Sequence, residues 1–155
     1  MLRPSIVRAI GAFLLMAGHL PCPAQETCLT IGIGTGGAYA EERPALVEAI
    51  FSKAGLCAKP LLVPLSRLDR MEDKGELDGN AWHDDSYLAT HSEMAKVPTP
   101  VEHFRGSLFW LRGHQESRVV RAVPLYLVVQ NRYKNLIPAL DKAIKAMRSS
   151  GAIQD

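Results

Sequence analysis

Short apolar runs and amphipathic stretches follow one another along most of the chain. The apolar runs predict five strands, at residues 28–34, 59–65, 76–82, 103–113 and 123–131. Stretches with helical spacing predict helices at residues 43–55, 67–75, 84–95 and 134–151. The alternation of strand and helix in the first half of the chain predicts an α/β fold with a parallel sheet.

Matched end signals mark the first and last of these helices. The first has Pro44 in its first turn and Gly55 at its end, and its predicted apolar face carries Leu46, Ile50 and Ala54. In the last helix, the residues expected to face inward are Leu136, Leu140, Ile144 and Met147. Ser66 stands where it can cap the helix at 67–75.

Residues 1–24 resemble a secretory signal peptide: two arginines come first, a short apolar core follows, and a cleavage site with small residues ends at Ala24. The apolar core is too short for a membrane span. We therefore expect an exported, periplasmic mature chain, residues 25–155, with no membrane span. Its length and the 47% hydrophobic composition suit one domain that buries roughly two-thirds of its unfolded surface.

Loss of the two arginines in the signal leaves 16 basic residues against 16 acidic residues in the mature chain. A net charge near zero gives no reason to expect a nucleic acid or an anionic membrane as partner.

Two cysteines, Cys28 and Cys57, remain in the mature chain, and each begins a predicted strand. Neighbouring parallel strands would bring them together, so an oxidising compartment favours a disulfide. Two buried free thiols are the alternative.

The glycines Gly32, Gly34 and Gly37 have the spacing G-x-G-x-x-G after a predicted strand. A dinucleotide site would also need an acidic residue at the end of the second strand, where the sequence has VPLSR. We therefore expect no nucleotide cofactor.

Ligands of open α/β sheets bind beyond the carboxyl ends of the strands. In this chain those ends carry aromatic and polar side chains typical of a small-molecule pocket: Tyr39, Ser66, Arg67, Asn80 and Trp82. Two alternatives stay open. The aromatic side chains could cover the sheet edge, and Arg67 could pair with an acid of its own helix.

Several motifs in a fixed order resemble the periplasmic solute-binding proteins that bind amino acids and related polar solutes for ABC importers. They are the segments LTIGIG, LVEAIFSKAGL, PLSRLDRMEDKGELDGNAW, MAKVPTPV and the tail from VPLYLVVQN onward. The resemblance implies a three-layer α/β lobe of the type II periplasmic-binding-protein fold, and a permease partner. It implies a binding protein for a small polar solute, with no catalytic residues, cofactor or metal.

Members of that family have two lobes that close on the solute. In this chain residues 25–111 resemble the first lobe and residues 123–155 resemble its returning strand and helix. Only residues 112–122 stand in place of the second lobe. The resemblance also places His83 at the position where members of the family often carry an arginine that binds the carboxylate of the solute. With an ordinary pKa near 6.5, His83 would bind a carboxylate more strongly as the pH falls.

Three further readings stay open. The chain could be a non-transporting remnant or a lobe that binds a protein partner. It could be an enzyme that uses His83, Asp84 and Asp85 as acid and base. His83, Tyr87 and His91 would share one helix face, which suggests zinc, although a solvated polar face is the simpler interpretation.

Overall fold

The computed structural model describes residues 27–35, 41–108 and 118–154. The predicted signal peptide and Tyr39 lie outside these residues.

The described chain contains strands and helices in the following order: β1 (Leu29–Thr35), α1 (Arg43–Lys53), β2 (Ala58–Pro64), α2 (Leu65–Asp73), β3 (Gly79–His83), α3 (Asp85–Leu88), β4 (Met94–Lys96), β5 (Glu102–Leu108), β6 (Arg118–Gln130), the 3₁₀ helix η1 (Asn131–Leu136) and α4 (Ile137–Ser149). All five predicted strands and three of the four predicted helices are present. The prediction of a helix over 84–95 is wrong, because that segment forms only the single turn α3 and then enters β4.

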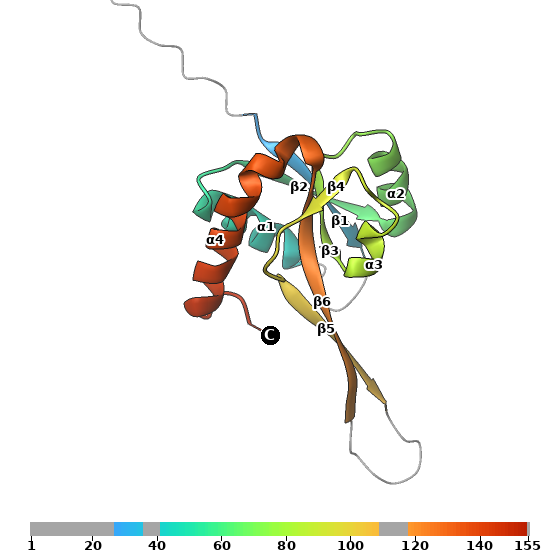
Figure 1. Ribbon diagram of the computed structural model, residues 1–155, viewed down its shortest axis with the longest axis vertical. Coiled ribbons are helices and arrows are strands. Elements are labelled where there is room, and N and C mark those ends of the chain that lie inside the picture. Colours follow the sequence, from blue (N-terminus) through green and yellow to red (C-terminus); the bar gives the residue numbers. More distant parts are fainter. Residues whose placement is uncertain (1–26, 36–40, 109–117, 155) are drawn as a thin grey trace, which may run out of the picture.

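The strands form one mixed sheet in the order β2-β1-β3-β6-β4, and β5 pairs with β6 (Figure 1). β1 is parallel to both β2 and β3, as predicted. β6 is antiparallel to β3, β4 and β5, so the prediction of a parallel sheet holds only for the first three strands. The difference arises because only residues 109–117 join β5 to β6, whereas a connection between parallel neighbours requires about a dozen residues or more.

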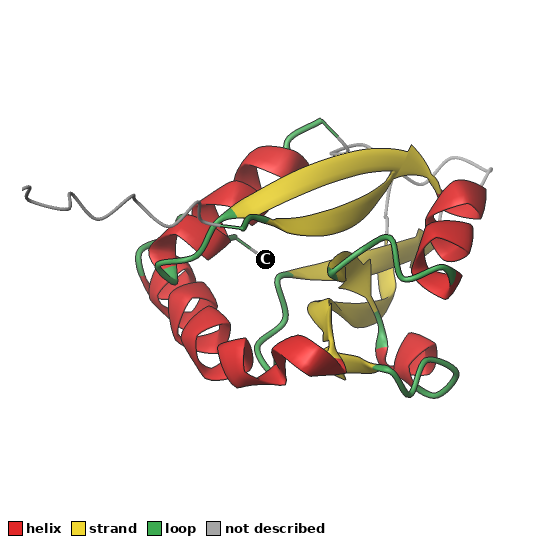
Figure 2. Ribbon diagram, turned by 90° about the horizontal axis from the view of Figure 1, so that it is seen from above, coloured by secondary structure: helices red, strands yellow, loops and turns green. Residues whose placement is uncertain are grey.

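Helices cover both faces of the sheet, which gives three layers (Figure 2). On one face α1 and α4 enclose the larger apolar core, which includes Phe51, Leu140 and Ile144. On the other face α2 packs over a smaller cluster of Val63, Leu68 and Leu77. The fold is therefore an α/β sandwich.

The glycines of β1 are explained by the packing of α2. Side chains alternate between the two faces of a strand, so Ile31 and Ile33 enter the larger core while Gly32 and Gly34 face α2. A Cβ atom at Gly32 would lie 2.5 Å from Cδ1 of Leu68. The G-x-G spacing therefore lets a helix approach the strand closely.

Cys28 and Cys57 form a disulfide, as predicted, with their Cα atoms 4.5 Å apart. The cysteines immediately precede β1 and β2, and the backbone N–H of Leu29 donates to the carbonyl oxygen of Cys57 at 3.0 Å. The bridge thus fastens the edge strand β2 to β1 at their amino ends.

The β5–β6 hairpin projects from the sheet (Figure 1). β3 pairs with β6 only as far as His83 opposite Tyr126, whereas β5 continues to pair with β6 from Leu125 to Arg118. Eight residues of β6 therefore extend roughly 26 Å beyond the end of β3, at about 3.3 Å per residue. Phe104 on this hairpin is 60% exposed.

In the part of the chain that the structure describes, no helix combines the length and the apolar character needed to cross a bilayer.

Candidate functional site

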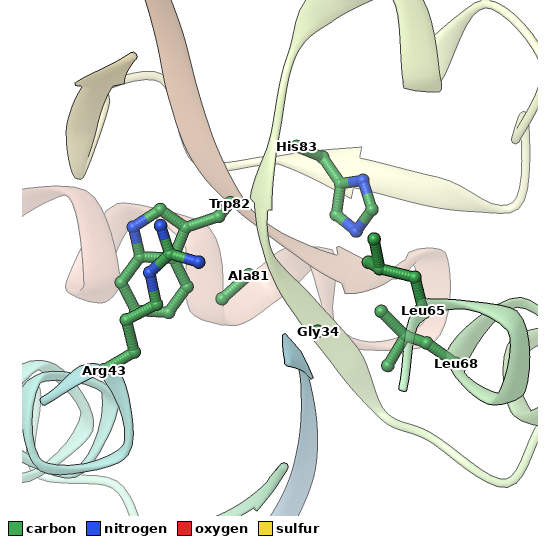
Figure 3. Close-up of a pocket in the computed structure, with 7 residues that line it drawn as sticks. All are labelled: Gly34, Arg43, Leu65, Leu68, Ala81, Trp82 and His83. Carbon is green, nitrogen blue, oxygen red and sulfur yellow. The ribbon is translucent and has the colours of Figure 1, made fainter. Parts of the chain in front are cut away.

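A hollow of about 180 Å³ lies beyond the carboxyl ends of β1 and β3 (Figure 3). Its described lining consists of Gly34, Arg43, Leu65, Leu68, Ala81, Trp82 and His83. The lining thus combines the last residues of two parallel strands with the first residues of α1 and α2. This is where an open α/β sheet binds ligands.

Trp82 has a backbone conformation that aromatic residues rarely adopt, with φ of 70°. It lies at a bulge between Ala81 and His83, where the register of β3 on β6 shifts. Because of the bulge, Trp82 packs against the same core as its neighbour Ala81. His83 then points to the other side, toward Leu65 (Figure 3).

Arg43 forms the wall opposite α2. It is the first residue of α1, and its guanidinium carbon lies 4.9 Å from the centroid of the Trp82 ring. Its Nη2 atom lies 3.4 Å from Oε2 of Glu102, at the base of the hairpin. Only 16% of the Arg43 side chain is exposed. The desolvated cation–π contact and the ion pair together hold the guanidinium beside the hollow.

His83 begins a stack of three rings. Its ring centroid lies 3.8 Å from that of Tyr87, which in turn lies 3.9 Å from that of His91. The pKa of His83 is lowered to about 4, chiefly by burial and then by the nearby charge of His91. The carboxylates of Asp69 and Asp84 act in the opposite direction. His83 is therefore neutral at pH 5.5, whereas the sequence suggested that it would be charged there.

Asn80 lies behind the hollow and does not line it. It is completely buried, and its Nδ2 donates to Oε1 of Glu72 at 2.5 Å. Its Oδ1 accepts a hydrogen bond from the backbone N–H of Ala81 at 2.7 Å. Tyr87 donates from its hydroxyl to the same oxygen of Glu72 at 2.7 Å. Asn80 therefore joins β3 to α2 and α3 through Glu72.

Ser66 and Arg67 are both exposed on the first turn of α2, outside the described lining. The prediction that Ser66 caps this helix is wrong, because α2 begins at Leu65 with Pro64 at the N-cap and no capping side chain. Of the predicted ligand-binding residues, the structure places Trp82 and His83 in the hollow.

Sequence reasoning missed Arg43. The available signal was its position, since the first turn of a helix favours acidic residues and an arginine there indicates a specific partner. The same reasoning singled out Arg67 in α2. The distance from Arg43 to Trp82 depends on the bulge in β3, which the sequence does not reveal.

The N-termini of α1 and α2 both adjoin the hollow. Neither has a side-chain cap or an acidic residue in its first turn, but the N-cap residue is Glu42 in α1 and Pro64 in α2. The first amides of a helix lack intrahelical acceptors and carry a partial positive charge. Arg43 and these two helix ends contribute positive charge beside the hollow, and the carboxylates of Glu42 and Glu102 contribute negative charge.

The two acidic residues that follow His83, Asp84 and Asp85, already have partners. Asp84 caps α3 by accepting hydrogen bonds from the backbone N–H groups of Ser86 at 3.0 Å and Tyr87 at 3.2 Å. Asp85 forms an ion pair with Lys96. The hydrogen bond from the Ser86 hydroxyl lowers the pKa of Asp84, whereas a general acid needs a raised one. Among the described residues, no group of three metal-binding side chains lies close enough to hold an ion.

The chain matches no protein family model, and no curated protein is significantly similar to it in sequence. The geometry of the hollow therefore carries the functional argument.

Proposed function

We propose that this chain is an exported, periplasmic solute-binding protein, built as a single lobe, that binds a small polar solute for an ABC importer. The observation that carries the proposal is the hollow at the carboxyl ends of β1 and β3, walled by Trp82 in its left-handed conformation. A residue held in this way costs roughly 1–3 kcal/mol, and such residues gather at ligand-binding sites. The resemblance to solute-binding proteins agrees with this location.

The β5–β6 hairpin supports a single-lobe interpretation. In the family that the chain resembles, the second lobe is inserted between the strands equivalent to β5 and β6. Here Leu108 still pairs with Arg118, and residues 109–117 alone join the two strands. The disulfide supports export, because such bridges persist in oxidising compartments.

A single lobe should bind its solute weakly. High affinity in small sites comes with burial of most of the ligand surface, and one lobe covers a single face. The hollow is also smaller than the roughly 300–1,000 Å³ of drug-sized pockets. We therefore expect dissociation constants near 1 mM, about 4 kcal/mol of binding free energy.

A lobe that binds a protein partner is the second candidate function. Leu65 at the rim of the hollow is 59% exposed, and Phe104 on the hairpin is 60% exposed. If these side chains belong to one contiguous apolar patch, that patch would be typical of a contact surface. In this case the hollow would hold no free solute.

Tryptophan fluorescence tests the proposal, because the chain has only two tryptophans, Trp82 and Trp110. In the mature protein carrying Trp110→Phe, the emission reports on the wall of the hollow alone. We expect one class among amino acids, small carboxylates and polyamines to change this emission. At a concentration of about ten times its dissociation constant, the solute should raise the free energy of unfolding by about 1.4 kcal/mol. This corresponds to a rise of roughly 5 °C in Tm.

Two glycine variants provide the control. Gly34→Ala places a Cβ atom against Cδ2 of Leu65, so this exposed side chain must shift at the hollow and the response should weaken. Gly106→Ala, on the hairpin, would have its nearest neighbour 3.9 Å away and should leave the response intact. If no solute class changes the emission or the Tm at about 20 mM, roughly twenty times the expected dissociation constant, the proposal is wrong.

A further inference from the structure

We infer that two copies of this chain associate through the β5–β6 hairpin, with the apolar face of one hairpin packed on the same face of the other about a two-fold axis. The inference goes beyond the proposed function and does not depend on a solute in the hollow. It concerns the segment that projects from the sheet (Figure 1).

One face of the hairpin continues the sheet face that α1 and α4 cover. Leu127 of β6 is buried in the larger core beneath these helices. Because side chains alternate along a strand, Leu125 and Val123 lie on the same face further along β6. Their partners on β5 are Glu102 and Phe104, and opposite residues of an antiparallel pair share a face. The register therefore joins Phe104, Val123 and Leu125 in one apolar patch.

This apolar patch is only partly covered by the rest of the described chain. Phe104 is 60% exposed, and Val123 and Leu125 are half-buried. A two-stranded ribbon is marginally stable by itself in water, and it gains stability when one face packs against another element. A partner on this face would therefore stabilise the hairpin as well as bury the aromatic ring.

The charges on this face change sign along its length. At the base of the hairpin, Glu102 contacts Arg43, and the exposed carboxylate of Glu42 stands next to Arg43 at the start of α1. The base thus has two carboxylates for one guanidinium. Toward the tip, the exposed Arg121 lies on the same face, two residues from Val123. At about 3.3 Å per residue, its row is about 13 Å from the row of Glu102.

The order of acidic base, apolar middle and basic tip is self-complementary. A two-fold axis through the row of Phe104 and Val123 would place Arg121 of each copy over the acidic base of the other. A two-fold interface uses the same patch on both copies, as this arrangement does. Glu102 can accept from Arg121 of the second copy while it keeps Arg43, since a carboxylate accepts several hydrogen bonds. An anionic membrane would match the tip alone and be repelled by the base.

The size of the face predicts a weak dimer. The described rows, 102–106 on β5 and 121–125 on β6, cover roughly 200 Å² for each copy, given the spacing of residues and strands. Stable interfaces bury about 800 Å² on each partner. We therefore expect a dissociation constant of about 1 mM, so that about half of the chains are dimeric at a total concentration of about 1 mM.

Sedimentation equilibrium of the mature protein, from about 0.05 mM to about 2 mM, tests the inference. Arg121→Glu should weaken association at least about tenfold, because it sets a carboxylate against the acidic base of the second copy. Phe104→Ser should also weaken it about tenfold, because it removes the aromatic ring from the centre of the interface. Both side chains are exposed, so the Tm of each variant should stay close to that of the parent.

Arg105→Glu is the matched control for Arg121→Glu. It changes the net charge by the same amount in the neighbouring row of the hairpin, where Arg105 pairs with Ala122. Arg105 is exposed on the opposite face. This variant should therefore change the dissociation constant less than about twofold, as expected for a charge outside the contact.

Four results would overturn the inference. The first is a parent protein that stays monomeric up to about 2 mM, twice the expected dissociation constant. The second is equal weakening by Arg121→Glu and Arg105→Glu, which would reflect net charge alone. The third is association that survives both Arg121→Glu and Phe104→Ser, which would use another surface. The fourth is a monomeric parent that binds phosphatidylglycerol vesicles, which would make a membrane the partner of this face.

Discussion

Asn80 donates from Nδ2 to Oε1 of Glu72 at 2.5 Å, across the interface between β3 and α2. The other carboxylate oxygen of Glu72 is buried and has no hydrogen-bond partner in the described part of the chain. Glu72 therefore depends on Asn80 and on the hydroxyl of Tyr87, which donates to the same oxygen. These hydrogen bonds set the position of α2, and hence of Leu65 and Leu68 in the hollow.

Asn80→Ala should lower the free energy of unfolding by about 2–3 kcal/mol, because it removes a hydrogen bond to a partly buried carboxylate. Tyr87→Phe should lower the free energy of unfolding by less, about 1–2 kcal/mol, because it removes only the hydroxyl and keeps the stacked ring. Urea unfolding of both variants, of Glu72→Ala and of the double variant Asn80→Ala/Glu72→Ala would measure the coupling. Additive single and double effects would contradict the dependence of Glu72 on Asn80.

His83 should make the protein less stable in acid. In the unfolded chain it takes up a proton near pH 6.5, whereas in the folded protein it stays neutral until about pH 4. Below pH 6.5 the unfolded state therefore binds more protons, and stability falls as the pH drops from 6.5 toward 4. The loss is up to about 3 kcal/mol at 1.36 kcal/mol for each pKa unit.

His83→Gln removes this titration and keeps a side chain of comparable size. Urea unfolding of parent and variant at pH 7.5 and pH 4.5 should show the parent losing about 2 kcal/mol more than the variant. Carboxylates that titrate in the same range affect both proteins and cancel in the difference. Parallel losses in the two proteins would mean that His83 has an ordinary pKa.

Removal of the disulfide should cost about 3–4 kcal/mol in the chain-entropy model, since the bridge spans 29 positions. Cys28→Ala/Cys57→Ala should accordingly unfold at lower urea concentration than the parent. Addition of a thiol reductant should shift the parent toward the variant and leave the variant unchanged. Alkylation of two cysteines in the unreduced parent, read by mass spectrometry, would show that the bridge does not form.

Gly32→Ala should destabilise the fold by about 1–3 kcal/mol, because its Cβ would overlap the ends of Leu68 and Leu77 in a packed cluster. Gly79→Ala should lower the free energy of unfolding by more than Gly32→Ala does. Its Cβ would lie 2.5 Å from the backbone oxygen of Val128, which cannot move aside as a side chain can. Thermal unfolding of the two variants beside Gly106→Ala measures the effect. Equal Tm values would show that the glycines of β1 do not serve the approach of α2.

Local signals in the sequence were enough for most of the fold. Pro44 and Gly55 marked the ends of a helix correctly, and the positions of Cys28 and Cys57 before two parallel strands led to the disulfide. β4 was missed because it has only three residues, and its pairing is set by β6, which lies more than twenty residues further along the chain. The antiparallel direction of β6 likewise depends on contacts between distant segments.

The candidate site was predictable only as far as its place on the sheet. Residues at the strand ends could be named, but simple alternation along β3 puts Asn80 and Trp82 on the same face. The bulge at Trp82 breaks that alternation and sends the indole to α1 instead. The partnership of Trp82 with Arg43 and the lowered pKa of His83 both follow from this backbone detail.

The edge strand β2 also bears on how the protein behaves at high concentration. An unpaired strand edge can recruit another chain and start aggregation. Pro60 and Pro64 in β2 have no N–H group to offer such a chain, and the charged side chain of Lys59 is exposed beside them. Because the disulfide also prevents β2 from peeling away at its amino end, the folded protein should resist edge-to-edge association, and reduction should make it more prone to aggregate.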